Sequence, residues 1–482
     1  MRYDLMTSGF IDRGQDARRP AVVGSDRALD WEMFESETGR WVREALVHGI
    51  GPDVPVAIHG HKEAGFMAAV AGCLSLRAPF VPVDEIYPEE RLQRIAAIVE
   101  APVIYRAGRG VFEKLAFQPK PMQERGLAYV MFTSGSTGEP KGVQIGRESV
   151  AGLVDWMRDC FGMGPAPVFM NQAPFSFDLS MYEVFGFLGL GGSIVMNSRA
   201  QVAEASAYQA RLREHGVSVW VSTPSFAHQQ LLDKRFDGAH LPTLKTFLFC
   251  GEVLPSKLVR RLRERFPAAR ILNTYGPTEA TVATTWMFID DAVLAAHDPL
   301  PVGRAKPGSI VRAEAGSGDL VILGEHVMRG YLNRPELNME KLFAEDGMRG
   351  FRTGDLGEVR QDGLVFCRGR RDDQIKLNGY RIELQEIDKA LQQLAGVARS
   401  AVVPLHKPDG SVGRLVAYVI LESAGSLEGW KEQLGKKLPP YMLPSELLPT
   451  AELPVSTNGK IDRKALEESY VRGAGAAPKL SS

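Results

Sequence analysis

Residues 133–142 read TSGSTGEPKG, and this stretch determines how the rest of the chain is interpreted. It combines glycines with Ser and Thr residues and one lysine, Lys141. Backbone N–H groups and hydroxyls in such a loop can hold phosphate oxygens. It is not a Walker P-loop, because Gly135 and Gly138 stand too close together and Gly142, rather than Ser or Thr, follows the lysine. The alternatives at this point are a phosphate-binding loop of another kind and an ordinary mobile turn.

The composition is that of an ordinary globular protein. A length of 482 residues favours two or more domains. The net charge is −1, from 57 basic and 58 acidic residues, which gives no general attraction to nucleic acid or to an anionic membrane. Four cysteines lie far apart without a CxxC pair, which indicates reduced thiols and no zinc site. Neither a signal peptide nor a run of about 18 apolar residues is evident, so we expect a cytoplasmic location.

The first two thirds of the chain alternate short apolar runs with helical patterns. Helices are predicted at 62–76 and 256–266, and strands at VPVAIHG (54–60), APFVPVD (78–84), SVWVSTP (218–224), TFLFCG (246–251) and RILNTYG (270–276). This alternation predicts an α/β fold of mostly parallel sheets covered by helices. Ligands in such folds bind beyond the carboxyl ends of the strands. PFSFD, FCGE and YGPTE each directly follow an apolar run and are therefore candidate site segments.

The last third of the chain has a different residue pattern. Glycine-punctuated apolar segments after about residue 300 predict a β-rich subdomain. The run GRRDDQIKLNGYR (369–381) is charged and turn-rich and is interpreted as a linker. The segments beyond it predict a small α+β domain joined by a hinge. We therefore expect a large domain at residues 1–371, a small mobile domain at 372–470 and a loose tail at 471–482.

Further motifs come after the glycine-rich loop in a fixed order. AYVMFTSGSTGEPKGVQI precedes FSFD, GEVLPSKL, NTYGPTEATVA, GYLNRPEL, FRTGDLGE, GRRDDQIKLNGYRIE and LPVSTNGKIDR. In these motifs, and over residues 20–466, the chain resembles the adenylate-forming superfamily of acyl-CoA synthetases, luciferases and peptide-synthetase adenylation domains. The resemblance favours the phosphate-binding loop over the turn. It implies an AMP-forming ligase that uses ATP and Mg²⁺.

The resemblance assigns most of the motif residues to ATP. Tyr275 would stack on adenine, Thr278 would bond the α-phosphate and Glu279 would hold Mg²⁺. Asp355 would accept the ribose hydroxyls, and Arg370 would lie against the ribose and phosphates. Taken singly, these residues would be ordinary turn residues or surface charges. The other residues expected to contact ATP are Thr133, Ser134, Gly135, Ser136, Thr137, Gly138, Lys141, Asn273, Thr274 and Gly276.

Lys460 in STNGKIDR is implied to be catalytic, together with Thr278 and Glu279. The Asn-Gly pair before it predicts a tight turn that presents the ammonium group. In the superfamily this lysine bridges the substrate carboxylate and the α-phosphate, where negative charge concentrates in the transition state. Its domain then rotates to admit a thiol, and Asp372 matches the hinge aspartate of the superfamily.

Asp178 in FSFD indicates the class of substrate. In the amino-acid branches of the superfamily, a carboxylate at this position pairs with the substrate ammonium group. Such a buried carboxylate rejects substrates without an amine, because it would be left unpaired. The simpler alternative is a helix cap, since LSMYEVFGF comes directly after it. The remaining substrate-binding positions implied by the motifs are Leu179, Tyr182, Ser225, Leu248, Cys250, Thr274, Val282 and Ala283.

Several segments are similar to the D-alanine–carrier protein ligases, among them NQAPFSFDLS and FCGEVLP. In those enzymes a cysteine at the position of Cys250 leaves room for little more than a methyl side chain, which favours D-alanine; a buried structural cysteine is the alternative. Tyr182 and Leu248 stand where methionines are expected, so L-alanine is the second candidate. We expect the acceptor to be the phosphopantetheine thiol of a separate carrier protein, because residues 461–482 are too few for a carrier domain.

Two other functions stay open. An acyl-CoA synthetase of a small carboxylic acid would share the ATP motifs but would carry an apolar residue at position 178. A non-catalytic ATP-binding relative would keep the fold but would have lost the lysine or the magnesium ligand. Asp178 argues against the first alternative, and the presence of Lys460 and Glu279 argues against the second. Neither nucleic acid nor membrane insertion is expected.

Overall fold

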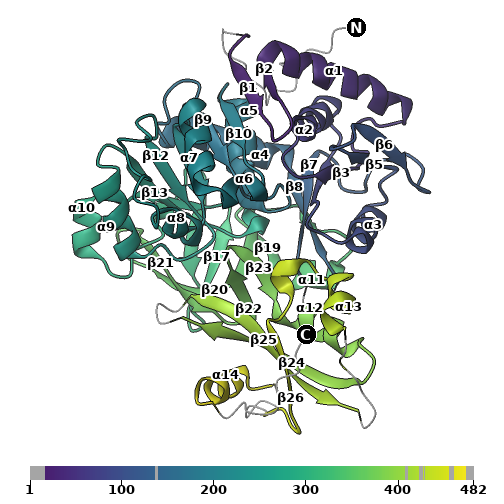
Figure 1. Ribbon diagram of the computed structural model, residues 1–482, viewed down its shortest axis with the longest axis vertical. Helices are drawn as coiled ribbons and strands as arrows, with labels where there is room; N and C mark the ends of the chain where they lie inside the picture. Colours follow the sequence, from purple (N-terminus) through teal and green to yellow (C-terminus); the bar gives the residue numbers. More distant parts are fainter. Residues whose placement is uncertain are drawn as a thin grey trace. The chain divides into compact units, whose positions relative to one another are not determined.

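The computed structural model describes residues 17–135, 139–407, 411–422, 427, 429–454 and 461–473 (Figure 1). The chain divides into two compact units. Unit 1 comprises Met1–Glu85, Ala96–Phe132 and Gly142–Arg371. Unit 2 comprises Ile86–Ile95, Thr133–Lys141 and Asp372–Ser482, so the last crossing from one unit to the other lies between Arg371 and Asp372.

The largest sheet of unit 1 is nine-stranded and mostly parallel. Its order is β15 (Arg304–Ala305), β14 (Thr285–Phe288), β13 (Arg270–Tyr275), β12 (Thr246–Phe249), β11 (Val219–Ser222), β9 (Val168–Asn171), β10 (Ser193–Met196), β1 (Pro20–Val23) and β2 (Ala28–Asp30). The strands from β13 to β1 run parallel to their neighbours, and β14, β15 and β2 are antiparallel. The strands predicted near 218, 246 and 270 are therefore confirmed as neighbours in one parallel sheet.

A second, seven-stranded sheet also belongs largely to this part of the chain. Its order is β18 (Gly330–Tyr331), β8 (Lys141–Gly146), β7 (Leu127–Thr133), β4 (Phe80–Asp84), β3 (Val56–Gly60), β5 (Val103–Arg106) and β6 (Val111–Lys114). β3 is parallel to β4 and β5, and β4 is parallel to β7. The strands predicted at 54–60 and 78–84 are thus confirmed, and the fold class is the predicted α/β arrangement.

Helices connect and cover these strands (Figure 1). Those before residue 200 are α1 (Trp31–Val47), α2 (Ala64–Leu76), α3 (Glu89–Ile98), α4 (Arg147–Cys160), α5 (Met181–Gly189) and α6 (Arg199–Ala203), with the short 3₁₀ turn η2 (Asp178–Ser180) before α5. Next come α7 (Ala205–Glu214), α8 (Pro224–Gln230), α9 (Ser256–Arg265), η3 (Thr278–Ala280), α10 (Asp291–Ala296) and α11 (Pro335–Lys341). α2 is almost entirely buried, which explains why its sequence is apolar on every face.

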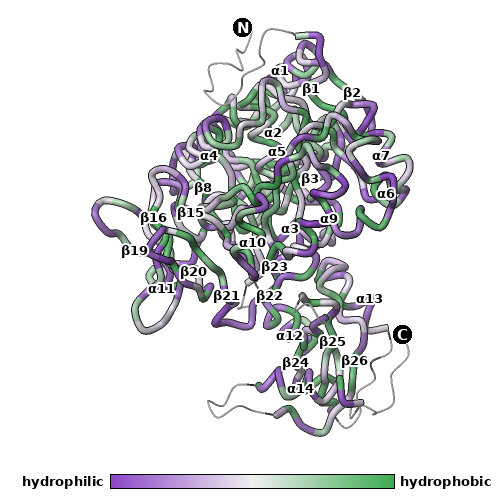
Figure 2. Tube along the Cα trace, turned by 90° about the vertical axis from the view of Figure 1, so that its left-hand side faces the viewer, coloured by the Kyte–Doolittle hydropathy of each residue, from purple (hydrophilic) through white to green (hydrophobic). Residues whose placement is uncertain are grey.

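A third, antiparallel sheet lies in the β-rich stretch that the glycine-punctuated sequence predicts. Its strands are β16 (Ile310–Ala313), β17 (Asp319–Leu323), β20 (Met348–Val359) and β19 (Leu342–Glu345), and β21 (Val365–Arg370) pairs with β20. In Figure 2 the interior segments of unit 1 are mostly hydrophobic (green). Hydrophilic stretches (purple) lie at its outside, for example around α6 and α7. The largest core cluster joins residues of both large sheets, such as Ile58, Phe80, Phe169 and Leu248.

Unit 2 contains a separate hydrophobic core, around Ile387, Val402 and Trp430. Its elements after residue 371 are β22 (Gln374–Leu377), β23 (Tyr380–Glu383), α12 (Leu384–Gln392), β24 (Val397–His406), β25 (Val412–Leu421), α13 (Trp430–Gly435), η4 (Pro440–Met442), β26 (Glu446–Pro449) and α14 (Arg463–Val471). β24, β25 and β26 form one sheet, in agreement with the predicted α+β character.

The segment 369–381 is mostly not the linker that its charge suggested. Residues 374–377 and 380–383 pair as a two-stranded hairpin, β22 and β23. The turn between them is Asn378-Gly379, and both residues have positive φ angles, 50° and 84°. Asn-Gly is the preferred pair for such a tight hairpin turn, which is the signal that the charge-based interpretation overlooked.

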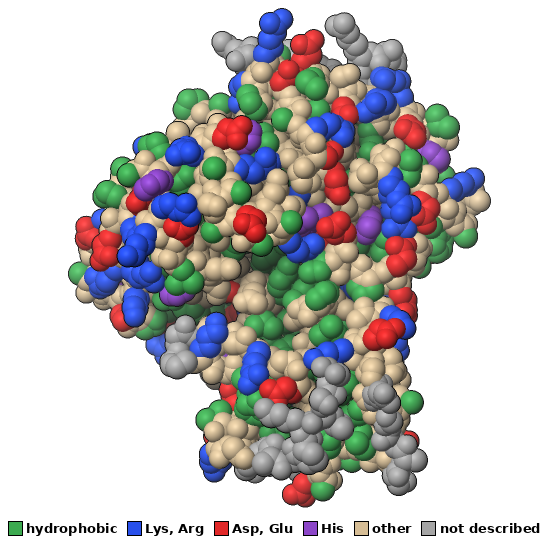
Figure 3. All heavy atoms as spheres, viewed as in Figure 1, with side chains coloured by type: hydrophobic (Ala, Val, Ile, Leu, Met, Phe, Trp, Pro, Cys, Tyr) green, Lys and Arg blue, Asp and Glu red, His purple; other side chains and the backbone are tan. Residues whose placement is uncertain are grey.

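The visible surface carries charges of both signs (Figure 3). Lys and Arg gather over α9, whose sequence SKLVRRLRER contains five basic residues. Over most of the face, basic and acidic groups are interspersed, as the balanced composition predicts. None of the helices in the described ranges has the length and apolar character needed to cross a membrane.

Candidate active site

The candidate residues of unit 1 lie after the carboxyl ends of neighbouring parallel strands. β9, β11, β12 and β13 lie in consecutive positions in the nine-stranded sheet. FCGE and YGPTE begin at the last residues of β12 and β13, and PFSFD begins shortly after the end of β9. The predicted convergence of these motifs at one edge of a parallel sheet is therefore confirmed, and this edge is where ligands bind in such folds.

Asp178 begins the turn η2 and is buried, with 8% of its surface exposed. The cap position of η2 is held by Phe177 and that of α5 by Ser180. Ser180 Oγ donates to the carbonyl oxygen of Phe177 at 2.7 Å and fixes the turn. Asp178 thus stands in neither cap position, and the helix-cap alternative loses its support.

Tyr182 lies near Asp178, Cys250 and Thr274. Burial raises the pKa of the Tyr182 phenol well above its usual value, and the nearby Cys250 and Asp178 add to this rise in pKa. Cys250 Sγ contacts the carbonyl oxygen of Val282 at 3.9 Å. Thr274 Oγ1 donates to the carbonyl oxygen of Phe249 at 2.9 Å. The buried Tyr182 phenol thus connects Asp178 with Cys250.

The other expected substrate-binding residues lie in the same part of unit 1. Leu179, Leu248 and Ala283 are buried and belong to the same core cluster as Tyr182. Ser225 is half-buried at the start of α8, where its backbone N–H donates to Glu252 at 3.0 Å. The bond joins the segment after β11 to the segment after β12.

Three expected ATP residues form one hydrogen-bonded group. Tyr275 Oη donates to Asp355 Oδ2 at 2.6 Å, and Arg370 pairs with Asp355 Oδ1 at 2.5 Å. Asp355 and Arg370 lie opposite each other on the paired strands β20 and β21. Burial, followed by the neighbouring Asp355 charge, raises the pKa of Tyr275 well above its usual value. Residues far apart in the sequence are thus brought together in one hydrogen-bonded group.

Glu279 is fully buried in η3, directly after β13. Its Oε1 accepts a hydrogen bond from Tyr331 Oη at 2.6 Å, and its backbone carbonyl accepts from Met328 N at 2.8 Å. The structure describes no cluster of three or more His, Cys, Asp or Glu side chains suited to a metal, within the residues it covers. One carboxylate still fits Mg²⁺, since this ion is commonly held by one or two carboxylates together with substrate phosphates and water.

Two motif residues near Glu279, Gly276 and Asn273, have structural roles in the surrounding backbone. A Cβ atom added to Gly276 would lie 2.4 Å from Ala283 Cα, so only glycine fits this close approach. Asn273 Nδ2 donates to the carbonyl oxygen of Pro301 at 2.9 Å, a contact that holds the chain in place. Thr278 is buried at the start of η3, next to Glu279.

The described part of the phosphate loop bonds to β23 and α12 within unit 2. Ser134 Oγ donates to the Arg381 carbonyl oxygen at 3.0 Å and accepts from Glu383 N at 3.1 Å. Lys141 Nζ donates to Glu383 Oε1 at 3.1 Å. In addition, the N–H group of Gly135 donates to a carboxylate oxygen of Glu386 at 3.1 Å. Groups suited to hold an anion are therefore engaged by two carboxylates.

The remaining residues expected in the loop, at the catalytic position and at the hinge are Thr133, Ser136, Thr137, Gly138, Lys460 and Asp372. Thr133 Oγ1 is buried without a hydrogen-bond partner in the parts of the chain that the structure covers. Ser136, Thr137, Gly138 and Lys460 lie outside the described residues. Asp372, the expected hinge, is the first residue of the last segment of unit 2, and its Oδ1 accepts from Gln374 N at 3.4 Å.

Two buried titratable groups that the sequence motifs did not single out both bond to Asn171, which precedes Asp178 in the chain. Lys62 and Glu183 are both fully buried. Burial lowers the pKa of Lys62 to about 7, against the opposing effect of the Asp84 charge. Burial raises the pKa of Glu183 to about 8, partly offset by its hydrogen bond with Asn171.

These shifts predict opposite contributions to stability. Glu183 binds its proton more tightly in the folded state, so its contribution to stability is lost as pH rises from about 4.5 to about 8. Lys62 binds its proton less tightly in the folded state, so stability is gained between about pH 7 and 10.5. Relative to Glu183→Gln, the thermal unfolding midpoint of the unchanged protein should therefore fall between about pH 5 and 8. If plots of the unfolding midpoint against pH ran parallel for the two proteins, the raised pKa of Glu183 would be contradicted.

Comparison with known families agrees with this arrangement. A family model described as AMP-binding enzyme matches residues 12–116 and 106–332, and the model of the AMP-binding enzyme C-terminal domain matches residues 386–460. A D-alanine–D-alanyl carrier protein ligase of Bacillus anthracis is 37% identical over 487 residues, which cover 92% of this chain and 95% of the relative. The ligase of the same description from Bacillus cereus is 37% identical over 488 residues, with the same coverage.

Solved structures share the fold at lower identity. The o-succinylbenzoate CoA synthetase of Bacillus subtilis has a TM-score of 0.82 and 18% identity, and the match covers 97% of this chain and 98% of that one. A Vibrio cholerae adenylation domain in complex with glycyl-adenosine-5′-phosphate has a TM-score of 0.81 and 20% identity, over 97% of each chain. With two matching family models and relatives above one-third identity along nearly its full length, the chain belongs to the AMP-binding, adenylate-forming enzymes and is an AMP-forming ligase.

Proposed function

We propose that this ligase adenylates a small amino acid, with D-alanine as the first candidate and L-alanine as the second. It would then transfer the aminoacyl group to the phosphopantetheine thiol of a carrier protein. The observation that carries the proposal is Asp178, a buried carboxylate at the carboxyl edge of the parallel sheet that holds neither helix-cap position. A substrate ammonium group would supply the opposite charge there.

The surroundings of Asp178 support a small side chain. Tyr182 is buried near both Asp178 and Cys250, and the rings of Trp156 and Phe161 lie 6.5 and 6.1 Å from the Tyr182 ring. Bulky rings packed on the Tyr182 side would favour a small substrate side chain over a large one, because protein interiors are close-packed. The carrier-protein ligases at 37% identity, which are described as acting on D-alanine, support the same choice.

The first half-reaction would proceed by attack of the substrate carboxylate on the α-phosphorus of ATP. The bond from α-phosphorus to the bridging oxygen breaks, and pyrophosphate leaves with the electron pair. Thr278 and Lys460 would donate to the α-phosphate, and Ser134 and Lys141 would hold the outer phosphates. Glu279 would hold Mg²⁺, which offsets negative charge on the phosphates when it is bound. Asp355 and Arg370 would lie at the ribose, with Tyr275 at the adenine.

In the second half-reaction, the carrier thiolate would attack the carbonyl carbon of the aminoacyl-adenylate. A thioester bond forms, the bond to the AMP oxygen breaks, and AMP leaves. Unit 2, with Lys460 and the expected hinge residue Asp372, would change its orientation between the two steps. Adenylation is needed before the thiol can attack, because a free carboxylate is a poor electrophile and the adenylate carries AMP as a leaving group.

The direct test is ATP–pyrophosphate exchange with a panel of acids. We expect exchange with D-alanine or L-alanine, weaker exchange with larger amino acids, and a preference over propionate on the order of 10⁴-fold. The preference arises because a site built to bind a polar group rejects an analogue that lacks it. Exchange with a fatty or aryl acid, together with none for any amino acid, would instead support an acyl-CoA synthetase. No exchange with any acid in the panel would favour a non-catalytic relative.

A further inference from the structure

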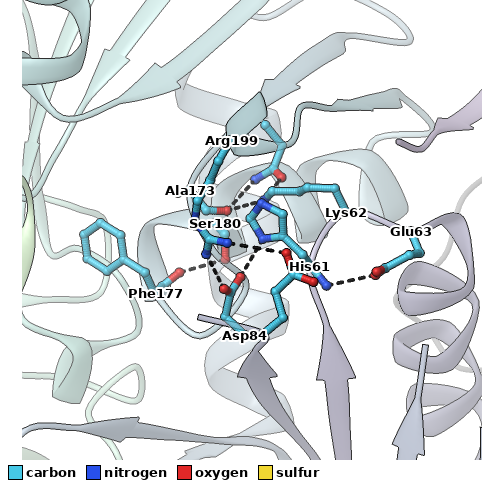
Figure 4. Close-up of polar contacts among 10 residues, drawn as sticks. His61, Lys62, Glu63, Asp84, Ala173, Phe177, Ser180 and Arg199 are labelled. Carbon is cyan, nitrogen blue, oxygen red and sulfur yellow. Dashed lines mark hydrogen bonds and ion pairs between the residues drawn. The ribbon is translucent and has the colours of Figure 1, made fainter. Parts of the chain in front are cut away.

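Lys62 lies in the middle of the short connection between β3 and α2, and its side chain is buried. Its ammonium group donates to Asn171 Oδ1 at 2.5 Å and also to the carbonyl oxygen of Ala173. The same group lies over the ring of Phe175, 4.3 Å from its centroid. Figure 4 shows Lys62 reaching the Ala173 carbonyl. One buried cation thus contacts three alternate residues of the segment that leads from β9 to Asp178.

Asn171 extends this network to the other side of Asp178. Its Nδ2 donates to Glu183 Oε1 at 3.0 Å. Glu183 belongs to α5, the helix that comes after η2. The chain is therefore held at Asn171 before Asp178 and at Glu183 after it, and Lys62 orients the asparagine that joins the two points.

A second link lies beside the first. Asp84, at the end of β4, is fully buried between His61 and Arg199 (Figure 4). Asp84 Oδ2 contacts His61 Nδ1 at 2.7 Å, and its Oδ1 pairs with Arg199 at the start of α6. Strands β3 and β4 belong to the seven-stranded sheet, whereas β9 and β10 belong to the nine-stranded sheet. Both links therefore join the carboxyl ends of one sheet to those of the other.

A lysine in this place is costly unless it has a specific task. Burying an ammonium group is unfavourable, and the hydrogen bonds and ring contact offset only part of the cost. An apolar side chain of similar length would fill the same volume without this penalty. The geometry points to a role for the ammonium group in fixing the segment 171–178, because that segment supplies two of its acceptors and the ring beneath it.

We propose that Lys62 is a positioning residue that holds Asp178 in place for the substrate ammonium group, through Asn171, Ala173 and Phe175. The inference rests on the proposed role of Asp178. It adds a specificity determinant that lies outside all the motifs and comes from the other sheet. Misplacing a binding group by about 1 Å can cost on the order of 10²-fold in rate, so the expected effect is measurable.

The test is Lys62→Met in ATP–pyrophosphate exchange. Methionine keeps an unbranched apolar chain but removes every donor. We expect KM for alanine to rise about 10-fold or more, with KM for ATP changed less than about twofold, because the ATP residues lie on other segments. The preference for alanine over propionate should fall in parallel. A Lys62→Arg variant, which keeps a charged donor, should recover part of the preference.

Arg147→Met is a matched control, since Arg147 also donates to a backbone carbonyl of unit 1, that of Leu74. It should leave both KM values unchanged. Equal rises in KM for alanine and ATP in Lys62→Met, or no rise in either, would overturn the proposal. If Lys62→Met does not fold, Asn171→Ala breaks the same bridge, and an unchanged KM for alanine in that variant would overturn it as well. Absence of amino-acid exchange in the unchanged protein would instead contradict the proposed function itself.

Discussion

Replacing Asp178 by asparagine is expected to lower kcat/KM for alanine by about 30-fold to several thousand-fold. This range corresponds to about 2–5 kcal/mol, the usual cost of truncating one partner of a buried charge pair. Asparagine has nearly the same shape, so the packing around η2 should be retained while the negative charge is lost. The measurement is ATP–pyrophosphate exchange at varied alanine and ATP concentrations. KM for ATP should stay within about twofold of its original value.

The control for this change is an exposed aspartate of unit 1. Asp155 lies on α4 and pairs with Arg158 at the surface. Surface ion pairs contribute about 0–1 kcal/mol, so Asp155→Asn should have little effect on exchange. An equal loss of alanine and ATP affinity in Asp178→Asn would show that the carboxylate supports the fold and does not bind the substrate.

Replacing Lys460 by alanine is expected to slow the adenylation step on the order of 10²–10³-fold. This is the typical loss when one preorganised donor to a developing negative charge is removed. Thiol attack on a supplied aminoacyl-adenylate should be affected far less, because no phosphoryl transfer occurs in that step. The two readouts are pyrophosphate exchange and single-turnover loading of a carrier protein from the presynthesised adenylate.

Lys464 provides the matched control, since it is an exposed lysine on α14 of the same unit. Lys464→Ala should leave both half-reactions unchanged. Equal slowing of both steps in Lys460→Ala would assign the lysine to stability, or to both steps, and would remove the support for a role confined to adenylation.

Much of the fold and the site could be predicted because the relevant signals are local. The apolar runs at 54–60 and 246–251 contain the strands β3 and β12, and the motif at the end of β13 carries Tyr275 and Glu279 to one edge of the sheet. Parallel strands bring the residues after their carboxyl ends to a common edge, so order along the chain predicts proximity in space. Asp355 contacts both Tyr275 and Arg370, as expected of three residues that the motifs assign to one ligand.

Lys62 could not be found in this way. In the sequence it lies in the polar stretch HKE (61–63) between a strand and a helix, which is typical of an exposed loop. Its burial depends on Asn171 and Phe175, more than one hundred positions away, and on the meeting of two sheets. Glu183 is similar, since a single acidic residue in an apolar helix can equally face solvent. Only tertiary packing distinguishes these cases.

The bonds of the phosphate loop to Glu383 and Glu386 have a consequence for the order of events in turnover. The N–H group of Gly135 and the ammonium group of Lys141 each donate to a carboxylate of unit 2. A donor engaged in this way is not available to a polyphosphate chain. In the proposed function this loop holds the outer phosphates of ATP, so the two carboxylates and those phosphates would be mutually exclusive occupants of it. Departure of pyrophosphate would free the loop for the carboxylates, so their bonds to Gly135 and Lys141 would belong to the stage of the cycle after adenylation.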